Sequence, residues 1–364
     1  MSLGRRELLG TGAAFAVTAA LPRTAMAFDF APQPGAWRNF EISTRLEIVP
    51  HGPAQAWIPV PSFSDAQWFR PAGSTWETDA RKVELAKDGK YGAEFVHVAW
   101  SDQQADRSIV VTSRFATRDR AIDLARVGDA PALSDADRAL FLSATELIPI
   151  DGIVKVTSDK ITAGATSDLD KARKIYEWIV VNTFRNPKTR GCGLGDIATM
   201  LESGNLGGKC ADLNALFVGL SRAAGLPARD IYGLRVAPSR FGYKSLGANS
   251  ETVTKSQHCR AEVYIAGLGW IPVDPADVRK VMLEEPPGNL PLDAPNVMAA
   301  RKALFGAWET NWLAYNTAHD LELPGAHGPK LAFLMYPQAE VAGVRIDCLD
   351  PDGFQYVIKA RELV

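Results

Sequence analysis

The chain has 364 residues, of which 46% are apolar and 23% charged, and its formal net charge is −2. This composition is typical of a globular protein that buries a substantial core, and the length suggests two or three domains. No basic stripe or run of like charge points to nucleic acid or to an anionic membrane surface, so we expect neither as a partner.

Residues 1–27 have the pattern of an export signal. Arg5 and Arg6 precede an Ala-rich apolar run, and Ala25-Met26-Ala27 follows as a small-residue cleavage site. The run is too short and too weakly apolar to span a membrane. The paired arginines are typical of the twin-arginine route, with an ordinary secretion signal as the alternative. We therefore expect a periplasmic or secreted protein with no integral membrane segment once the signal is removed.

Residues 28–150 are expected to form an N-terminal β-rich domain. Apolar and polar residues alternate from Phe40 to Ile48, which is the period of a half-buried strand. Enrichment in β-branched and aromatic residues predicts further strands at 94–100 and 109–117. The run 56–61 is expected to be an edge strand or a strand end, because it contains two prolines. A helix is expected to begin at Ser134.

Residues 151–289 are expected to form an α+β core. Start and stop signals predict a helix after Thr166, a short helix between Asp196 and Gly204, and a third helix that begins at Cys210. Strands are predicted at 228–236, 257–265 and 270–273. The polar stretch 237–256 between them is long enough to form a rim or a lid.

Residues 290–364 are expected to add a C-terminal helix and a β-hairpin. The helix is predicted from Asn296 to about Thr317, and a β pair is predicted at about 331–336 and 354–362. No function is assigned to this extension.

Cys210 is the first candidate for chemistry. It follows Gly207-Gly208-Lys209 and begins a helix, whose free N–H groups and positive end stabilise a thiolate. The glycine pair allows close backbone approach and is expected to leave the sulfur uncovered. The N–H of Cys210 is a natural donor to an oxyanion. We expect Asp212 to cap the helix rather than to act in catalysis.

His258 and Asp274 are the candidate base and its orienting carboxylate. Their relative position depends on the turn between two strands. A two-residue turn would pair Asp274 with Ala261 and point it away from His258. A loop of odd length centred on Gly267 would pair Asp274 with Arg260 and place both side chains on one face, within reach of each other. The prediction is the odd loop.

Other chemically reactive residues are weaker candidates. A lone Cys on a helix is usually a small buried hydrophobe, so Cys210 needs its partners to be catalytic. Asp277 and Asp196 are alternatives to Asp274. His97 and Cys259 are expected to be structural, His319 to lie at a helix end, and Cys192 has no assigned role. No CxxC or HExxH motif is present, so a zinc site is not expected.

Four segments together resemble the bacterial transglutaminase-like superfamily: Gly-Gly-Lys-Cys-Ala-Asp-Leu at 207–213, Arg-Ala-Ala-Gly-Leu-Pro-Ala-Arg at 222–229, His-Cys-Arg-Ala-Glu-Val-Tyr at 258–264 and Gly-Trp-Ile-Pro-Val-Asp-Pro at 269–275. The resemblance covers about residues 165–285. It implies a papain-like core in which Cys210, His258 and Asp274 transfer an acyl group from a peptide or protein amide, through a thioester, to water or an amine. It implies no metal or organic cofactor.

Two departures from the family pattern concern the acceptor. Many members have Trp two residues after the catalytic His, where this chain has Arg260, and animal-type enzymes have Trp after the Cys, where it has Ala211. We therefore favour hydrolysis over transamidation. The alternative function is a catalytically silent binding or scaffold module. The sequence assigns neither a second oxyanion donor nor an oligomeric state.

Overall fold

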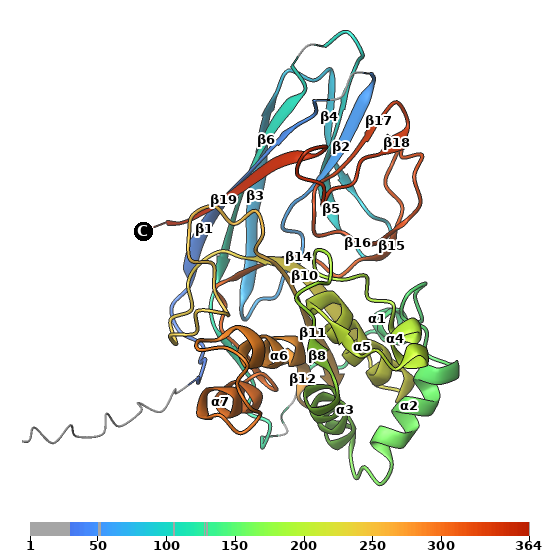
Figure 1. Ribbon diagram of the computed structural model, residues 1–364, viewed down its shortest axis with the longest axis vertical. Coiled ribbons are helices and arrows are strands. Elements are labelled where there is room, and N and C mark those ends of the chain that lie inside the picture. The colour runs from blue at the N-terminus through green and yellow to red at the C-terminus, as the bar shows by residue number, and fades with distance from the viewer. Residues whose placement is uncertain (1–29, 50–51, 105, 127, 129, 364) are drawn as a thin grey trace, which may run out of the picture.

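The computed structural model describes residues 30–49, 52–104, 106–126, 128 and 130–363. The predicted export signal lies outside these residues. The described chain has a mixed α+β fold in which a β sandwich stands on a core of helices packed around a third sheet (Figure 1). This confirms the expected fold class.

Two antiparallel sheets form the β sandwich, with the strand orders β19-β1-β6-β3 and β18-β17-β2-β5-β4. The bounds are β1 Arg38–Glu47, β2 Ala54–Pro59, β3 Phe69–Thr78, β4 Lys82–Lys87, β5 Glu94–Trp100, β6 Ser108–Thr117, β17 Gln338–Val341, β18 Val344–Arg345 and β19 Gln355–Leu363. The alternation predicted around Phe40 is confirmed. Leu46 packs between the sheets, while Phe40 and Ile42 extend the core below them.

The third sheet has the antiparallel order β12-β11-β10-β14 and carries the central helix α5. Its strands are β10 Ala228–Arg235, β11 Gln257–Ile265, β12 Gly269–Val273 and β14 Trp312–Asn316, and α5 spans Cys210–Ala223. Every residue of α5 is buried, because other helices cover the side turned away from the sheet. These helices are α1 Asp135–Leu142, α2 Gly152–Thr162, α3 Asp168–Asn182, α4 Ile197–Ser203 and α6 Pro275–Glu284.

The helix starts follow the capping residues in the sequence. The side chains of Ser134, Ser167 and Asp196 each accept the backbone N–H three residues further on, at the first turns of α1, α3 and α4. Gly204 ends α4 in the left-handed region at φ 69°, where a residue without a Cβ is favoured. The short helix predicted between Asp196 and Gly204 is therefore confirmed.

The expected helix over 296–317 is wrong in its second half. Helix α7 spans only Pro295–Ala303, and the chain passes through Gly306, at φ +118°, into β13 Ala307–Trp308 and then β14. Strand β14 is buried along its whole length, so it shows no alternation of apolar and polar residues. The helix was predicted there because Trp308, Trp312 and Tyr315 have the spacing of residues on one face of a helix.

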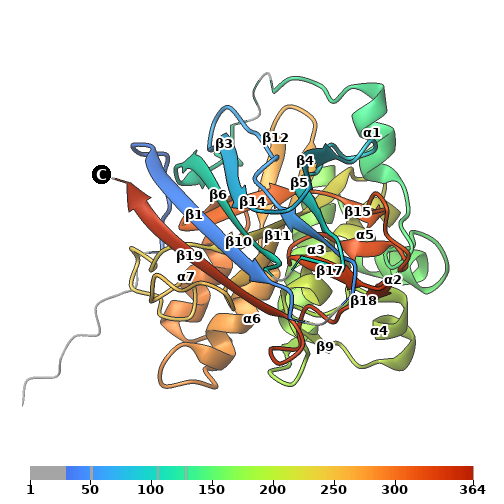
Figure 2. The same ribbon diagram turned by 90° about the horizontal axis from the view of Figure 1, so that it is seen from above.

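The two C-terminal strands form near their predicted positions but do not pair with each other. Strand β19 pairs with β1, and both views show it lying along the first sheet (Figure 2). Strand β16 Leu331–Phe333 pairs with β15 His319–Leu321, so His319 lies in a strand rather than at a helix end. The remaining short pairs are β7 Arg120–Ala121 with β13, and β8 Phe184–Arg185 with β9 Gly207–Gly208. The segment after residue 290 thus completes all three large sheets. No helix within the described ranges has the length and apolar character needed to cross a bilayer.

Candidate active site

The hairpin between β11 and β12 has the predicted odd loop. Ile265 pairs with Gly269 and Ala261 with Val273, so three residues centred on Gly267 form the turn. In this register Asp274 follows opposite Arg260, on the same face as His258. The geometric prediction is confirmed, because His258 Nε2 lies 2.7 Å from Asp274 Oδ2.

Asp274 is also the N-cap of helix α6. Its Oδ1 accepts the backbone N–H of Asp277 at 3.0 Å, and Pro275 occupies the first turn, where no amide donor is needed. The amide of Asn214, on α5, lies 3.4 Å from the same oxygen and donates to the Cys259 carbonyl at 2.8 Å. The carboxylate is therefore fixed from α6 and α5 as well as from its own strand.

The glycine pair before Cys210 is required by close packing. A Cβ at Gly207 would lie 2.2 Å from the Phe184 ring, and a Cβ at Gly208 would lie 2.5 Å from Asp212. The expected close approach of the backbone is present. The sulfur was expected to be uncovered, but Cys210 is buried, with only 3% of the residue exposed. It is reached from a cleft rather than from an open surface.

Asp212 fastens the loop beside Cys210 to the start of α5. Its carboxylate accepts the backbone N–H groups of Lys209, Leu194 and Gly195 at 2.9–3.0 Å. The capping role predicted for Asp212 is confirmed, and the contacts to the preceding loop are an addition. That loop carries Cys192, whose carbonyl accepts the N–H of Ala211 at 2.9 Å.

The amide N–H of Cys210 points to no acceptor among the described residues. It lies at the N-terminal end of α5, where the helix leaves its first N–H groups without partners. This donor is free to bond a developing oxyanion on a carbonyl attacked by the adjacent sulfur.

Two buried arginines and a second carboxylate surround the His258–Asp274 pair. Asp277 Oδ2 lies 3.4 Å from His258 Nε2, and its Oδ1 bonds Arg235 at 2.5 Å. Arg260 Nε lies 3.5 Å from Asp274 Oδ2. Because each carboxylate has an arginine partner, the imidazole faces a network with balanced charge. Asp277, the sequence-based alternative to Asp274, is thus part of the same network. Arg235 was not predicted, because it ends a strand without any motif.

The network sets the protonation of His258 and Cys210. Burial and Arg235 lower the pKa of His258, but Asp277 and Asp274 outweigh them and raise it to about 9. Hydrogen bonds from the Cys192 and Cys259 thiols lower the pKa of Cys210 well below its usual value. Burial alone would raise this pKa, and His258 lowers it further. Both shifts favour a thiolate on Cys210 beside an imidazolium on His258. With Nε2 bound to the carboxylates, Nδ1 is the nitrogen left for the sulfur.

His258, Asp274 and Asp277 have the donor atoms of a metal site, within 4.8 Å of one another. Their surroundings do not favour a cation. Arg235 and Arg260 already neutralise the two carboxylates, and the raised pKa keeps the His258 ring protonated, whereas a ligating imidazole must be neutral. The cluster is suited to holding a proton on His258.

Arg260 and Ala211, the two departures from the family pattern, are both buried. The Arg260 guanidinium lies over the rings of Trp312 and Trp308, 4.9 and 5.3 Å from their centroids, and donates to the Glu309 carbonyl. The Trp312 indole donates to the His258 carbonyl at 2.9 Å. Aromatic rings thus support Arg260 from behind, and neither Arg260 nor Ala211 is among the residues that line the cleft reaching Cys210.

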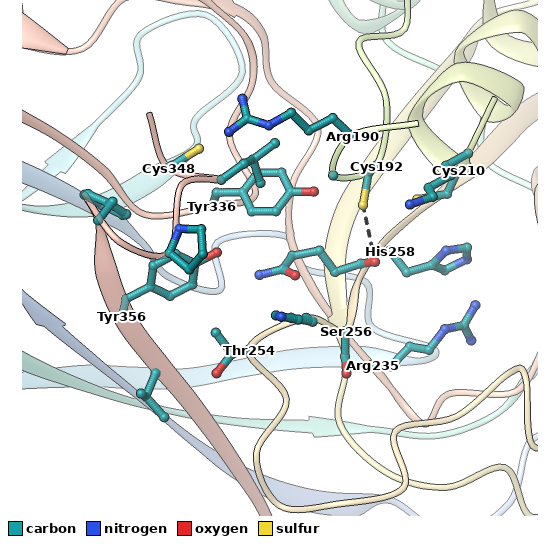
Figure 3. A pocket seen from close by; sticks show the side chains of 18 of the residues that line it. Arg190, Cys192, Cys210, Arg235, Thr254, Ser256, His258, Tyr336, Cys348 and Tyr356 are labelled. Atoms are coloured by element: carbon teal, nitrogen blue, oxygen red, sulfur yellow. Dashed lines mark hydrogen bonds between the residues drawn. The ribbon is translucent and has the colours of Figure 1, made fainter. Parts of the chain in front are cut away.

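A cleft of about 870 Å³ opens between the core and the β sandwich and reaches Cys210 and His258. In Figure 3, Cys210, His258 and Arg235 lie on one side and Tyr336, Tyr356 and Cys348 on the other. The loop 237–256 forms part of its rim through Gly247 and residues 254–256. Backbone bonds such as Val253 N–H to the Ile358 carbonyl, at 2.8 Å, fasten this loop to β19.

The four cysteines all lie within the described residues and are free thiols. Cys259 is buried, as expected, yet its thiol still hydrogen-bonds that of Cys210. Cys192, to which the sequence assigned no role, lies between the Gln257 carbonyl, 3.4 Å from its sulfur, and Cys210 (Figure 3). His97 is buried in β5 and stacks on Trp57, in keeping with a structural role. Asp196 only caps α4.

Comparisons with known proteins agree with this architecture. Residues 155–275, which include Cys210, His258 and Asp274, match the family model of the transglutaminase-like superfamily. Over 333 residues the chain is 36% identical to an uncharacterized protein of Haemophilus influenzae, covering 87% of this chain and 89% of that protein. A solved structure from Cytophaga hutchinsonii, provisionally named a cysteine protease, aligns with a TM-score of 0.51 at 16% identity, over 90% of this chain and 99% of that one. At that identity the likeness shows the fold. Residues 155–275 of the chain therefore form a domain of the transglutaminase-like superfamily.

Proposed function

We propose that this protein is an exported, cysteine-dependent acyl-transfer enzyme. It acts on peptide or glutamine-type amide bonds through a thioester on Cys210, with hydrolysis favoured over transamidation. The observation that carries the proposal is the pairing of His258 with Asp274, at 2.7 Å, on the wall of a cleft that also exposes a Cys210 thiol of strongly lowered pKa.

In the first half of the reaction the Cys210 thiolate attacks the amide carbonyl. The negative charge moves to the carbonyl oxygen, where the N–H of Cys210 and the N-terminal end of α5 stabilise it. The imidazolium of His258 gives its proton to the leaving amine, and the C–N bond breaks. The products are a free amine and an acyl thioester on Cys210. Asp274 keeps the ring oriented and stabilises its positive charge, as the third member of a nucleophilic triad.

In the second half the neutral His258 accepts a proton from water as the water attacks the thioester. The tetrahedral intermediate expels the Cys210 thiolate and releases a carboxylic acid, which restores the thiolate–imidazolium pair. Each proton taken up by His258 in this half replaces the one given up in the first half. The cycle therefore needs only the residues of the site and water.

Water is favoured over an amine acceptor for two reasons. At Arg260, where many family members have tryptophan, and at Ala211, where animal-type enzymes have it, this chain supplies no aromatic side chain to exclude water. Basic side chains such as Lys209 and Lys255 line the cleft, and they repel the protonated form of a primary amine.

The experiment that tests the proposal compares the mature protein with its Cys210→Ala variant. Both are incubated with a peptide library, with and without a primary amine, and the products are identified by mass spectrometry. Cleaved or deamidated peptides that depend on Cys210 support hydrolysis. Amine adducts that depend on Cys210 would make transamidation the main reaction. No Cys210-dependent product, together with iodoacetamide alkylation of Cys210 no faster than that of a free thiol, would favour a silent binding module.

A further inference from the structure

The cleft that reaches Cys210 has a strong excess of positive charge. Among the described residues that line it, seven side chains are Lys or Arg and two are Glu. The whole chain, by contrast, has a net charge of −2. The side chains that line the cleft therefore carry an excess of the sign opposite to that of the whole chain.

Ion pairs neutralise only some of this charge. Arg235 is bonded to Asp277, and Arg190 lies 2.5 Å from Asp347. Arg185 and Lys280 share the single carboxylate of Glu284. The pKa of Lys280 is lowered by burial first and next by the charge of Arg235, as expected where cations crowd one another.

Lys209 and Lys255 contribute charge that the protein itself does not compensate. Neither forms an ion pair with another described residue. Lys209 directly precedes the nucleophile, at the N-terminal end of α5, where the helix adds a positive potential of its own. Lys255 lies three residues before His258, on the rim of the cleft. Both lysines therefore line the cleft, one next to Cys210 in the chain and the other three residues before His258.

Arg45 and Glu47 extend the cleft onto strand β1 of the sandwich. They lie 3.5 Å apart, and more than half of each side chain is exposed, so solvent screens this pair strongly. The pair adds no net charge. The unpaired charge thus lies on the core side, close to the nucleophile, where a bound peptide must pass.

We propose that the cleft selects acyl donors that carry carboxylates on the residues next to the attacked amide, with Lys209 and Lys255 as the determinants of this selectivity. The inference rests on the proposed function, whose substrate class it narrows. A carboxylate beside the scissile amide meets a lysine ammonium, whereas a basic residue at the same place meets a like charge. A polyphosphate would match the charge but offers no acyl carbon to Cys210.

The test uses three peptide pools with a central glutamine whose neighbours on both sides are glutamate, glutamine or lysine. For the mature protein we expect kcat/KM to fall in the order glutamate, glutamine, lysine, and the differences to shrink as salt is raised from about 0.05 to about 0.5 M. In the double variant Lys209→Gln, Lys255→Gln the preference for glutamate over glutamine should fall by roughly three- to tenfold, mainly through KM. The control Lys302→Gln, which removes an exposed charge on α7 away from the cleft, should keep it.

A binding measurement separates failure of this inference from failure of the proposed function. Fluorescein-labelled peptides from the glutamate and glutamine pools are titrated into the Cys210→Ala variant, which retains both lysines. Tighter, salt-sensitive binding of the glutamate peptide, lost on adding Lys209→Gln and Lys255→Gln, supports the selectivity even if no turnover occurs. Equal binding and equal Cys210-dependent turnover of all three pools would overturn the selectivity and leave the acyl-transfer proposal standing.

Discussion

Asp274 uses its two carboxylate oxygens for two different partners. Oδ2 lies 2.7 Å from His258 Nε2, and Oδ1 accepts the backbone N–H of Asp277 at 3.0 Å. The residue that begins helix α6 is therefore also the one that orients the imidazole. A shift of the β11–β12 register by one residue would turn Asp274 to the other face of the sheet and separate the two roles.

The substitution Asp274→Asn separates these roles. The Asn side chain still caps α6 through its oxygen, but its amide group cannot accept a bond from His258 and carries no charge. We expect kcat/KM to fall roughly a hundred- to ten-thousandfold, while the cap of helix α6 is retained. Asp196→Asn, which changes the cap of α4 in the same way, should keep full activity. Equal activities of the two variants would remove Asp274 from the site.

The rate should depend on pH in a way that an ordinary thiol does not show. The pKa of Cys210 is well below its usual value and that of His258 is raised to about 9, so the ion pair exists through neutral pH. Activity should be flat across neutral pH and fall above about pH 9, where His258 loses the proton that it gives to the leaving amine. Cys348 serves as an internal reference, because burial raises its pKa. Site-resolved alkylation at pH 6 should modify Cys210 far ahead of Cys348, and equal rates would contradict the ion pair.

Cys192 should tune the nucleophile without being consumed. Its thiol is the first of the groups that lower the pKa of Cys210. Cys192→Ala removes this hydrogen bond, so the midpoint of the alkylation–pH curve of Cys210 should move to higher pH. Cys192→Ser retains a donor and should lie closer to the wild type. Cys348→Ala, which also alters the cleft, should leave the midpoint unchanged, and an unchanged midpoint in Cys192→Ala would exclude the tuning role.

Asp230 should make the folded state less stable as the pH rises. Burial raises its pKa from 3.8 to about 7, although Arg222 opposes the shift, and His319 Nε2 lies 3.5 Å away. A carboxyl whose pKa is raised on folding contributes stability that is present below about pH 4 and lost as the pH rises through about 7. The difference is on the order of 4 kcal/mol. Asp230→Asn should match the wild type near pH 4 and be more stable at pH 8 in denaturant titrations. The opposite order at pH 8 would contradict this assignment.

Local signals in the sequence, together with the family-like segments, were sufficient to select Cys210, His258 and Asp274 as candidates. Glycine placement and capping residues set the start of α5, and the parity of the loop at Gly267 decides which face carries Asp274. These features depend on neighbours within about ten residues. The same holds for the strands of alternating pattern, such as β1, and for the helices that begin at Ser167 and Asp196.

Long-range pairings and buried strands could not be predicted in the same way. Strand β19 pairs with β1 from the other end of the chain, and no local period specifies its partner. Strand β3 was missed because Pro71 and Gly73 disfavour a strand, although the structure accommodates them in a bulge. Arg235 and Cys192 became visible only when folding brought them beside His258 and Cys210, since neither belongs to a motif.

The most direct measurement is to trap the covalent intermediate. The mature protein is mixed with the peptide pool that it turns over fastest, quenched in acid, and analysed by intact mass and peptide mapping. The account predicts one acyl group on Cys210, removed by neutral hydroxylamine as a thioester would be, and absent from Cys210→Ala. Turnover that persists in Cys210→Ala, or an acyl group mapped to another residue, would contradict it.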